Sequence, residues 1–248
     1  MSFKDHFSKQ SAEYAKFRPR YPQEMYAFIL AHVKTKDTAW DVATGNGQVA
    51  LVLAEHFNKV IATDASENQI KHAGQHPHIT YIVSTAENSG LPAGVANLIT
   101  VGQALHWFDF EKFFAEVKRV AKPSCFFASW GYRIQHINPE IDVITRRFDE
   151  ELVGPYWPKE RVFVNEQYDT IPLPFKPIDA PQFTLKWKWN MRELLGYLNT
   201  WSSTQLYIKA NRHNPLDLIE KDLLNAWGNP EVEREILWPI YFKAGYVG

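Results

Sequence analysis

The stretch Thr38-Ala-Trp-Asp-Val-Ala-Thr-Gly-Asn-Gly-Gln-Val-Ala50 decides the fold, because it joins an apolar strand to a helix through a glycine turn. We expect the strand at 38–42 and the helix at 48–56. The glycines let the backbone approach a ligand without a Cβ in the way, and the helix start offers unpaired N–H groups. Asp64 ends the next apolar stretch, where a carboxylate can accept the hydroxyls of a ribose. The sequence therefore predicts a nucleotide-binding unit.

The bulk composition favours an ordinary globular enzyme. The chain has 248 residues, is 45% hydrophobic, and carries a formal net charge of −1 from 27 basic and 28 acidic residues. This balance builds no positive field of the kind that nucleic acid or an anionic membrane surface requires. A single cysteine, Cys125, excludes an internal disulfide and fits a reducing compartment. No apolar run approaches a membrane span, and the start 1–11 is too polar for a signal peptide. We expect a soluble cytoplasmic protein.

The first half alternates strands with helices. We expect strands at 38–42, 59–63, 79–83, 97–101 and 125–130, and helices at 22–33, 48–56, 66–73 and 110–121. Such alternation predicts an α/β fold with a doubly wound, mostly parallel sheet, and ligands bind beyond the carboxyl ends of its strands.

After Trp130 this alternation stops. Helical patterns follow at 137–152, 191–201 and 215–226, and strand patterns at 183–189 and 236–246. We expect one domain over 1–248, with a core at about 22–133 plus the late strands and a helical cap at about 137–230. The chain is 15% aromatic with nine tryptophans. The aromatic second half either encloses a flat or apolar ligand or forms a core under irregular loops.

The glycine turn leaves the type of nucleotide open. Gly45-Asn-Gly-Gln-Val-Ala50 satisfies the G-x-G-x-x-G/A pattern of dinucleotide enzymes, so a nicotinamide-dependent oxidoreductase is one alternative. Asp41 argues against it, because its charge would repel a pyrophosphate and attract an ammonium group. Further turns at Ala86-Glu87 and 103–107 follow the third and fourth strands. An adenosine lying across strands one to three, with a reactive group above strand four, accounts for all of these features.

These residues resemble the class I S-adenosylmethionine-dependent methyltransferases, from about Tyr14 to Trp130. Further motifs resemble the trans-aconitate methyltransferase-like group, whose members methylate small molecules, often carboxylates. These motifs are Tyr14-Ala-Lys-Phe-Arg-Pro-Arg-Tyr-Pro22, Gln103-Ala-Leu-His-Trp-Phe-Asp109, Asn165-Glu-Gln-Tyr168, Gly196-Tyr-Leu-Asn-Thr-Trp201 and Trp238-Pro-Ile-Tyr-Phe242. The resemblance implies a Rossmann-like sheet of seven strands, with the last strand antiparallel and inserted. It also implies S-adenosyl-L-methionine as cofactor, S-adenosyl-L-homocysteine as product, and a small-molecule methyl acceptor.

The chain departs from the family pattern at three positions. Ala43 and Ser124 stand where glycine is common, and Thr85 stands where an acid is common. The adenine amino group would therefore meet Glu87, a backbone carbonyl or water.

The resemblance also implies the cofactor site. Its candidate residues are Tyr14, Arg18, Asp41, Ala43, Gly45, Gly47, Asp64, Ala65, Ala86, Glu87, Gln103 and Ala104. Asp41 would orient the methionine end, directly or through the loop backbone, although it could merely pin the turn. Asp64 would hold the ribose; as a helix cap it would duplicate Ser66. Arg18 would pair with a carboxylate of cofactor or acceptor, or else be solvated.

His106 is the candidate catalytic residue, because it follows the fourth strand, where an acceptor should approach. It would remove a proton from a hydroxyl or amine acceptor, only orient a carboxylate, or simply support its turn. The candidate acceptor residues are His106, Trp107, Trp130, Tyr132 and Arg133, and aromatic rings among them could face a sulfonium. We expect no metal, since His72, His76 and His78 lack a partner ligand.

Two alternatives concern the acceptor. Nucleic-acid methylation is disfavoured, because no Asn/Asp-Pro-Pro-aromatic segment follows the fourth strand. A catalytically idle protein that only binds the cofactor is the remaining alternative.

Overall fold

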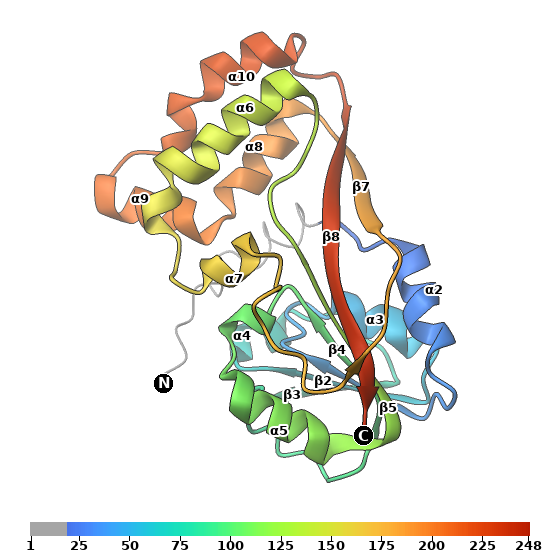
Figure 1. Cartoon of the computed structure of the whole chain (residues 1–248). Coiled ribbons are helices and arrows are strands. Elements are labelled where there is room, and N and C mark those ends of the chain that lie inside the picture. Colours follow the sequence, from blue (N-terminus) through green and yellow to red (C-terminus); the bar gives the residue numbers. More distant parts are fainter. Residues whose placement is uncertain (1–18) are drawn as a thin grey trace.

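An eight-stranded sheet with a helical cap at one end forms the computed structural model, which describes residues 19–248 (Figure 1). The strand order is β3-β2-β1-β4-β5-β8-β6, and β7 also pairs with β8. Five neighbouring strands are parallel: β1 (Thr38–Val42), β2 (Lys59–Asp64), β3 (Ile79–Val83), β4 (Ala96–Gly102) and β5 (Ala121–Tyr132). Their carboxyl ends meet at the edge of the sheet where the predicted site lies. This arrangement confirms the predicted doubly wound sheet.

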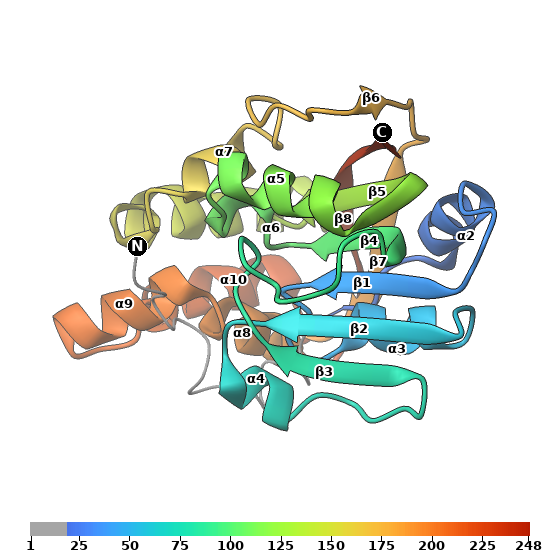
Figure 2. The same cartoon turned by 90° about the horizontal axis from the view of Figure 1, so that it is seen from below.

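The register of the parallel strands brings distant site residues together. Asp41 pairs with Ala62 of β2 on one side and with Thr100 of β4 on the other. The strand is apolar apart from this residue and Thr38, and all five of its residues are buried. β1 is the middle one of the five parallel strands, with β3 at one edge of the sheet, as Figure 2 shows.

The last strand, β8 (Arg234–Val247), is antiparallel and inserted, which confirms the prediction. Residues 240–247 pair with β5, and residues 234–240 pair on the other side with β7 (Phe183–Trp189). The expected number of strands was seven. The additional strand is β6 (Lys176–Pro177), whose two residues pair with Tyr246 and Gly245. It lies in a proline-containing segment that shows no alternation of apolar and polar residues, so the sequence pattern did not predict it.

Helices cover both faces of the sheet. Helices α2 (Gln23–Ala31) and α3 (Gln48–Ala54) share one hydrophobic cluster, and α5 (Phe110–Val120) packs in the other. A short helix, α4 (Glu67–Lys71), follows β2, and Ser66 caps it by accepting a hydrogen bond from Gln69 N. The apolar residues Phe113, Phe114, Val117 and Val120 of α5 are all buried.

The cap lies far along β8 from the carboxyl terminus (Figure 1). It comprises α6 (Pro139–Arg147), a π-helical turn η3 (Phe148–Leu152), η4 (Gly154–Tyr156), α7 (Arg161–Asn165), α8 (Met191–Asn199), α9 (Ser202–Asn211), η5 (Pro215–Leu218) and α10 (Glu220–Trp227). The single helix expected at 137–152 is thus shorter and ends in a π turn, and α9 was not predicted. No helix in the described part of the chain is long and apolar enough to cross a bilayer.

The tryptophans of the second half mostly build the core. Trp189, Trp201, Trp227 and Trp238 are all buried and belong to the cluster that also contains α2 and α3. For these four residues, the interpretation as an aromatic core under irregular loops therefore holds.

Candidate functional site

The loop after β1 has the backbone that its glycines require. Gly45 and Gly47 have φ of 57° and 82°, and Ala43 has φ of 51°. A Cβ on Gly45 would meet no atom of the described residues within 4 Å, so this part of the loop faces open space. A Cβ on Gly47 would collide with the hydroxyl of Tyr81. Ala43 takes a left-handed conformation that costs a non-glycine residue about 1 kcal/mol, which explains why glycine is common there.

Asp41 holds the loop to the neighbouring strand. Its Oδ2 accepts a hydrogen bond from Thr44 Oγ1 (2.5 Å), and its Oδ1 accepts one from Thr100 Oγ1 (2.8 Å). The side chain is 1% exposed, and this burial raises the pKa of the carboxyl to about 6 against the lowering effect of the two hydroxyls. Asp41 therefore acts on the glycine loop through Thr44, and its direct contact with a ligand stays a prediction.

Asp64 ties the turns after β1 and β2 together. Its Oδ2 accepts a hydrogen bond from Gly45 N (2.9 Å), and its Oδ1 accepts one from Ser66 N (2.8 Å). A carboxylate offers about four lone-pair positions, so these bonds are compatible with further donors from a ribose. Ala65 lies between these two turns and is half-buried.

The other candidate cofactor residues hold the framework of the site with their side chains. Glu87 Oε1 accepts from Asp109 N (3.0 Å) at the start of α5, next to the buried Ala86. The side-chain amide of Gln103 donates to Tyr132 O (2.9 Å) and accepts from Tyr132 N (3.0 Å), which fixes the ends of β4 and β5. Gln103 has φ of 57°, and this turn leads through the buried Ala104 to His106.

His106 lies on η2 (Leu105–Trp107) and is a neutral, buried histidine. Its Nδ1 lies 2.8 Å from the hydroxyl of Tyr168. The side chain is 8% exposed, and its burial, assisted by the positive charge of Arg161, lowers its pKa to about 3. The imidazole is therefore uncharged at neutral pH. Tyr168 is itself fully buried, with its ring centroid 4.7 Å from that of Tyr241.

The expected acceptor residues divide into two groups. Trp107 is half-buried, and its ring centroid is 4.8 Å from that of His106. Trp130 and Tyr132 are buried in the core, where Trp130 stacks on Phe242. The structure thus places Trp107 beside His106 and the other two in the hydrophobic cluster that contains α2 and α3. Tyr14 and Arg18 lie outside the described residues.

Arg133 belongs to a cluster of charged side chains that the sequence did not predict. Its Nη2 lies 3.0 Å from Glu150 Oε1 and 3.7 Å from Asp149 Oδ2. Asp149 also pairs with Arg161. Arg161 begins the short helix α7, in a stretch of sequence without clear periodicity, so no sequence pattern indicated it. Tyr168 and Tyr241 stand in motifs quoted above for the resemblance, and that was the available signal for them.

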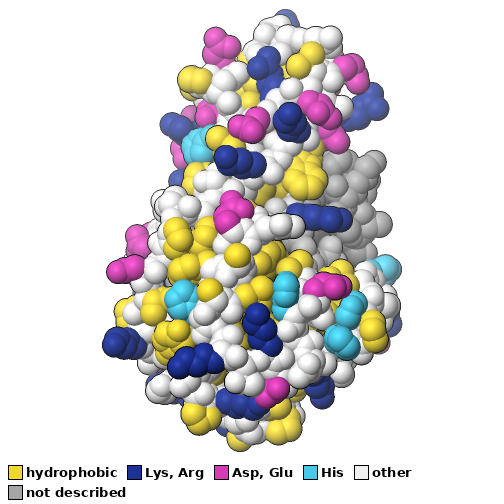
Figure 3. All heavy atoms as spheres, turned by 90° about the vertical axis from the view of Figure 1, so that its right-hand side faces the viewer, with side chains coloured by type: hydrophobic (Ala, Val, Ile, Leu, Met, Phe, Trp, Pro, Cys, Tyr) yellow, Lys and Arg dark blue, Asp and Glu magenta, His cyan; other side chains and the backbone are white. Residues whose placement is uncertain are grey.

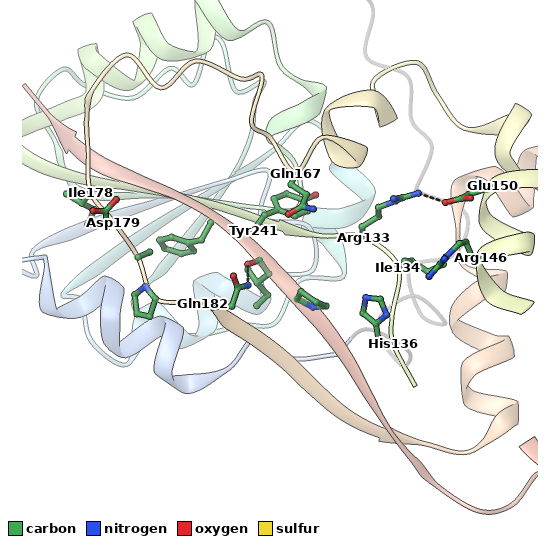
Figure 4. A pocket seen from close by; sticks show the side chains of 15 residues that line it. Arg133, Ile134, His136, Arg146, Glu150, Gln167, Ile178, Asp179, Gln182 and Tyr241 are labelled. Atoms are coloured by element: carbon green, nitrogen blue, oxygen red, sulfur yellow. Dashed lines mark hydrogen bonds and ion pairs between the residues drawn. The ribbon is translucent and has the colours of Figure 1, made fainter. Parts of the chain in front are cut away.

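Two cavities lie where the cap meets the sheet. One, of about 460 Å³, is lined by Arg133, Asp149, Glu150, Gly154, Trp157, Pro158, Arg161, Val162 and Asn165. The other, of about 710 Å³, runs along β8 and includes Tyr241, His136 and Gln182 (Figure 4). Arg133 and Glu150 line both, and Figure 4 shows their ion pair at one end of the larger cavity.

The surface around this region carries mixed charges. In Figure 3 hydrophobic side chains gather over the middle of the face, and basic and acidic side chains alternate on the cap above. Within residues 19–248 no group of three or more His, Cys, Asp or Glu side chains is placed to hold a metal ion. His76 instead lies 3.5 Å from Glu55, and His78 bonds Ala54 O.

Comparisons with known proteins agree with this geometry. The family model described as a methyltransferase domain matches residues 40–129. A Dictyostelium discoideum protein with a provisional methyltransferase name is 32% identical over 246 residues, covering 96% of this chain and 94% of that protein. A methyltransferase of Aspergillus candidus is 28% identical over 220 residues, covering 76% and 68%. The solved structure of a provisionally named type II methyltransferase from Anaeromyxobacter dehalogenans is 39% identical, with a TM-score of 0.86 and coverage of 93% and 98%.

Proposed function

Because the chain belongs to the class I S-adenosylmethionine-dependent methyltransferases, we propose that it methylates a carboxylate oxygen of a small molecule bound beneath the cap. The observation that carries this proposal is His106, which is buried, uncharged and hydrogen-bonded to Tyr168 beside the cofactor end of the sheet. The resemblance to the trans-aconitate methyltransferase-like group supports the same class of acceptor.

S-adenosylmethionine is the cofactor of this family, and the residues after β1 and β2 fit it. The open space over Gly45 admits a ligand, and Asp64 presents a carboxylate at the end of β2. When bound, the cofactor supplies a methyl group that is already activated on a sulfonium. We propose that Asp64 and Ala65 contact the ribose, Ala86 and Glu87 the adenine, and the loops at 43–47 and 103–104 the methionine end. Tyr14 and Arg18 would complete this site.

His106 fits the role of orienting a carboxylate better than the role of a base. A group whose conjugate acid has a pKa of about 3 removes a proton from a hydroxyl or an amine poorly. A carboxylate needs no such help, because it is already deprotonated at neutral pH. We propose the tautomer in which the Tyr168 hydroxyl donates to Nδ1, so that the ring proton lies on Nε2 and can donate to the acceptor. Positioning alone can lower a barrier by about 7–11 kcal/mol.

The volumes of the two cavities beside the cap suit a small methyl acceptor. Cavities of about 460 and 710 Å³ lie within the range of small-molecule sites, which is roughly 300–1,000 Å³. The net charge of −1 provides no electrostatic attraction for a nucleic acid. The matched proteins named above give no support to a nicotinamide-dependent reductase or to an idle binding protein.

The proposal is tested by incubating the protein with labelled S-adenosylmethionine and a panel of carboxylic acids, phenols and amines. We expect label in the acids, as a methyl ester that alkali releases. We also expect His106→Ala to lower turnover while S-adenosylhomocysteine affinity stays nearly unchanged. Label only in phenols or amines would overturn the carboxylate proposal, and S-adenosylhomocysteine binding without label in any class would favour the idle binding protein.

A further inference from the structure

The smaller cavity is lined by two arginines from different elements. Arg161 begins α7 in the cap, and Arg133 directly follows β5 of the sheet. We call the cavity between them the Arg133–Arg161 pocket, with the lining given above and a volume of about 460 Å³. Asp149 and Trp157 are its other functional neighbours. The pocket therefore joins the cap to the end of the sheet.

Arg161 is half-buried and only weakly paired. Its side chain is 16% exposed, and its guanidinium carbon lies 4.0 Å from the ring centroid of Trp157. Its closest carboxylate oxygen is Asp149 Oδ1, at 3.4 Å from Nη2. Its Nε is buried and has no hydrogen-bond partner among residues 19–248. One edge of the guanidinium thus has an unmet donor.

Asp149 cannot neutralise both arginines well. It is 3% exposed and accepts a hydrogen bond from Trp157 Nε1 at 2.9 Å. It also faces Arg133 at 3.7 Å, beyond hydrogen-bond distance. The better partner of Arg133 is the exposed Glu150, and Arg133 Nε is likewise buried without a partner in the described chain. One buried carboxylate is therefore shared between two guanidinium groups and an indole.

Leaving buried N–H donors of two arginines without acceptors costs free energy, and a ligand whose oxygens accept from them removes this cost. We propose that Arg161, with Arg133, binds a carboxylate of the methyl acceptor that is separate from the methylated atom, so that Arg161 determines acceptor specificity. This inference rests on the proposed function. It also requires the pocket to adjoin His106, and α7, which begins with Arg161, packs against η2, which carries His106.

The geometry favours a carboxylate over a neutral polar group. A guanidinium presents parallel N–H donors in a planar fork that matches the two oxygens of a carboxylate. Trp157 stacks on one face of this fork and limits its movement. A neutral amide in the same place would accept at a single oxygen and leave a second N–H donor unmet.

The test compares acceptors that differ only in the remote charge. Succinate, glutarate and adipate, each against its monoamide, are titrated calorimetrically into protein saturated with S-adenosylhomocysteine. We expect the wild type to bind at least one diacid roughly ten- to a hundredfold more tightly than its monoamide, the range expected for a charged hydrogen bond. Arg161→Met should abolish this preference, and Arg161→Lys should retain part of it.

Arg192→Met is the matched control, because it removes the same charge from an exposed position of the cap on α8. It should keep the preference, and the thermal transition of each variant verifies its fold. A preference that is missing in the wild type, or that survives Arg161→Met, overturns the inference. If diacid binding depends on Arg161 but no methyl label is transferred to any acid, the inference about the pocket holds and the proposed function fails. If label is transferred equally to diacids and monoamides, and Arg161→Met does not change this transfer, the proposed function holds and the inference about the pocket fails.

Discussion

Nδ1 of His106 lies 2.8 Å from the hydroxyl of Tyr168, although 62 positions separate them in the chain. The contact joins the turn after β4 to the segment after α7, and so connects the sheet end to the cap. Gln167 and Tyr168 have φ of 52° and 64°, so this segment holds a conformation that favours glycine. The tyrosine is thus held in place at some cost, which is typical of residues at functional sites.

Replacing Tyr168 by Phe should lower turnover and leave S-adenosylhomocysteine affinity unchanged. The change removes the hydroxyl and leaves a buried imidazole nitrogen without its partner, which costs about 1–3 kcal/mol of stability. Steady-state kinetics and urea unfolding measure the two effects. Tyr156→Phe is the control, because it removes a hydroxyl that accepts from Asn211 on the exposed cap. An unchanged turnover in Tyr168→Phe would show that His106 needs no positioning.

His106 should make the protein less stable as the pH falls. Its pKa is about 3 in the folded protein, below its ordinary value of 6.5, so the unfolded chain binds the proton more readily. Its contribution to stability is therefore present above pH 6.5 and is lost as the pH falls towards 3. His106→Gln should reduce this loss in urea unfolding measured across the same pH window. A pH dependence identical in both proteins would place the imidazole in water.

Asp41 should make the protein less stable as the pH rises, which is the opposite of the effect of His106. Burial raises its pKa from 3.8 to about 6, so the folded protein holds this proton more tightly than the unfolded chain. Its favourable contribution is present below pH 3.8 and is lost as the pH rises through 6. Asp41→Asn should therefore flatten the stability profile on this side. The two single variants and the double variant separate the opposing effects, and a profile unaltered by Asp41→Asn would contradict the buried carboxyl.

The loop after β1 should respond to substitutions in a graded order. Ala43→Gly relieves a left-handed alanine and should raise the free energy of unfolding by up to about 1 kcal/mol. Gly45→Ala should lower the free energy of unfolding by about 1 kcal/mol, because its φ of 57° is unfavourable for alanine. No further loss is expected, because the new Cβ meets no atom of the described residues within 4 Å. Gly47→Ala should cost more, because its Cβ also collides with Tyr81. Urea unfolding measures the series, and equal costs at 45 and 47 would contradict the packing of Tyr81.

The sheet and the glycine loop could be predicted from the sequence because their signals are local. Their sequence spacing alone identifies the apolar strands, the turn glycines Gly45 and Gly47, and the acidic residue Asp64. Ala43 shows how a departure from the pattern is resolved, since the backbone keeps its left-handed conformation and the alanine bears the strain.

The acceptor side could not be predicted in the same way, because it depends on contacts between distant segments. Trp130 is buried and stacks on Phe242, so its contact with an acceptor depends on the bound state and stays a prediction. Arg161 carries no signal in its own neighbourhood. Its importance arises only when α7 folds back against Asp149 and Trp157.

The carboxylate of Asp64 offers the most direct measurement of the central claim, that an adenosyl cofactor binds across β1 and β2. Calorimetry with S-adenosylhomocysteine should show binding to the wild type, weakened in Asp64→Ala by about 1–3 kcal/mol through the loss of a charged acceptor. Glu67→Ala, on the exposed side of α4, should bind like the wild type. Binding of NADH in place of S-adenosylhomocysteine, or an affinity that Asp64→Ala leaves unchanged, would contradict the account.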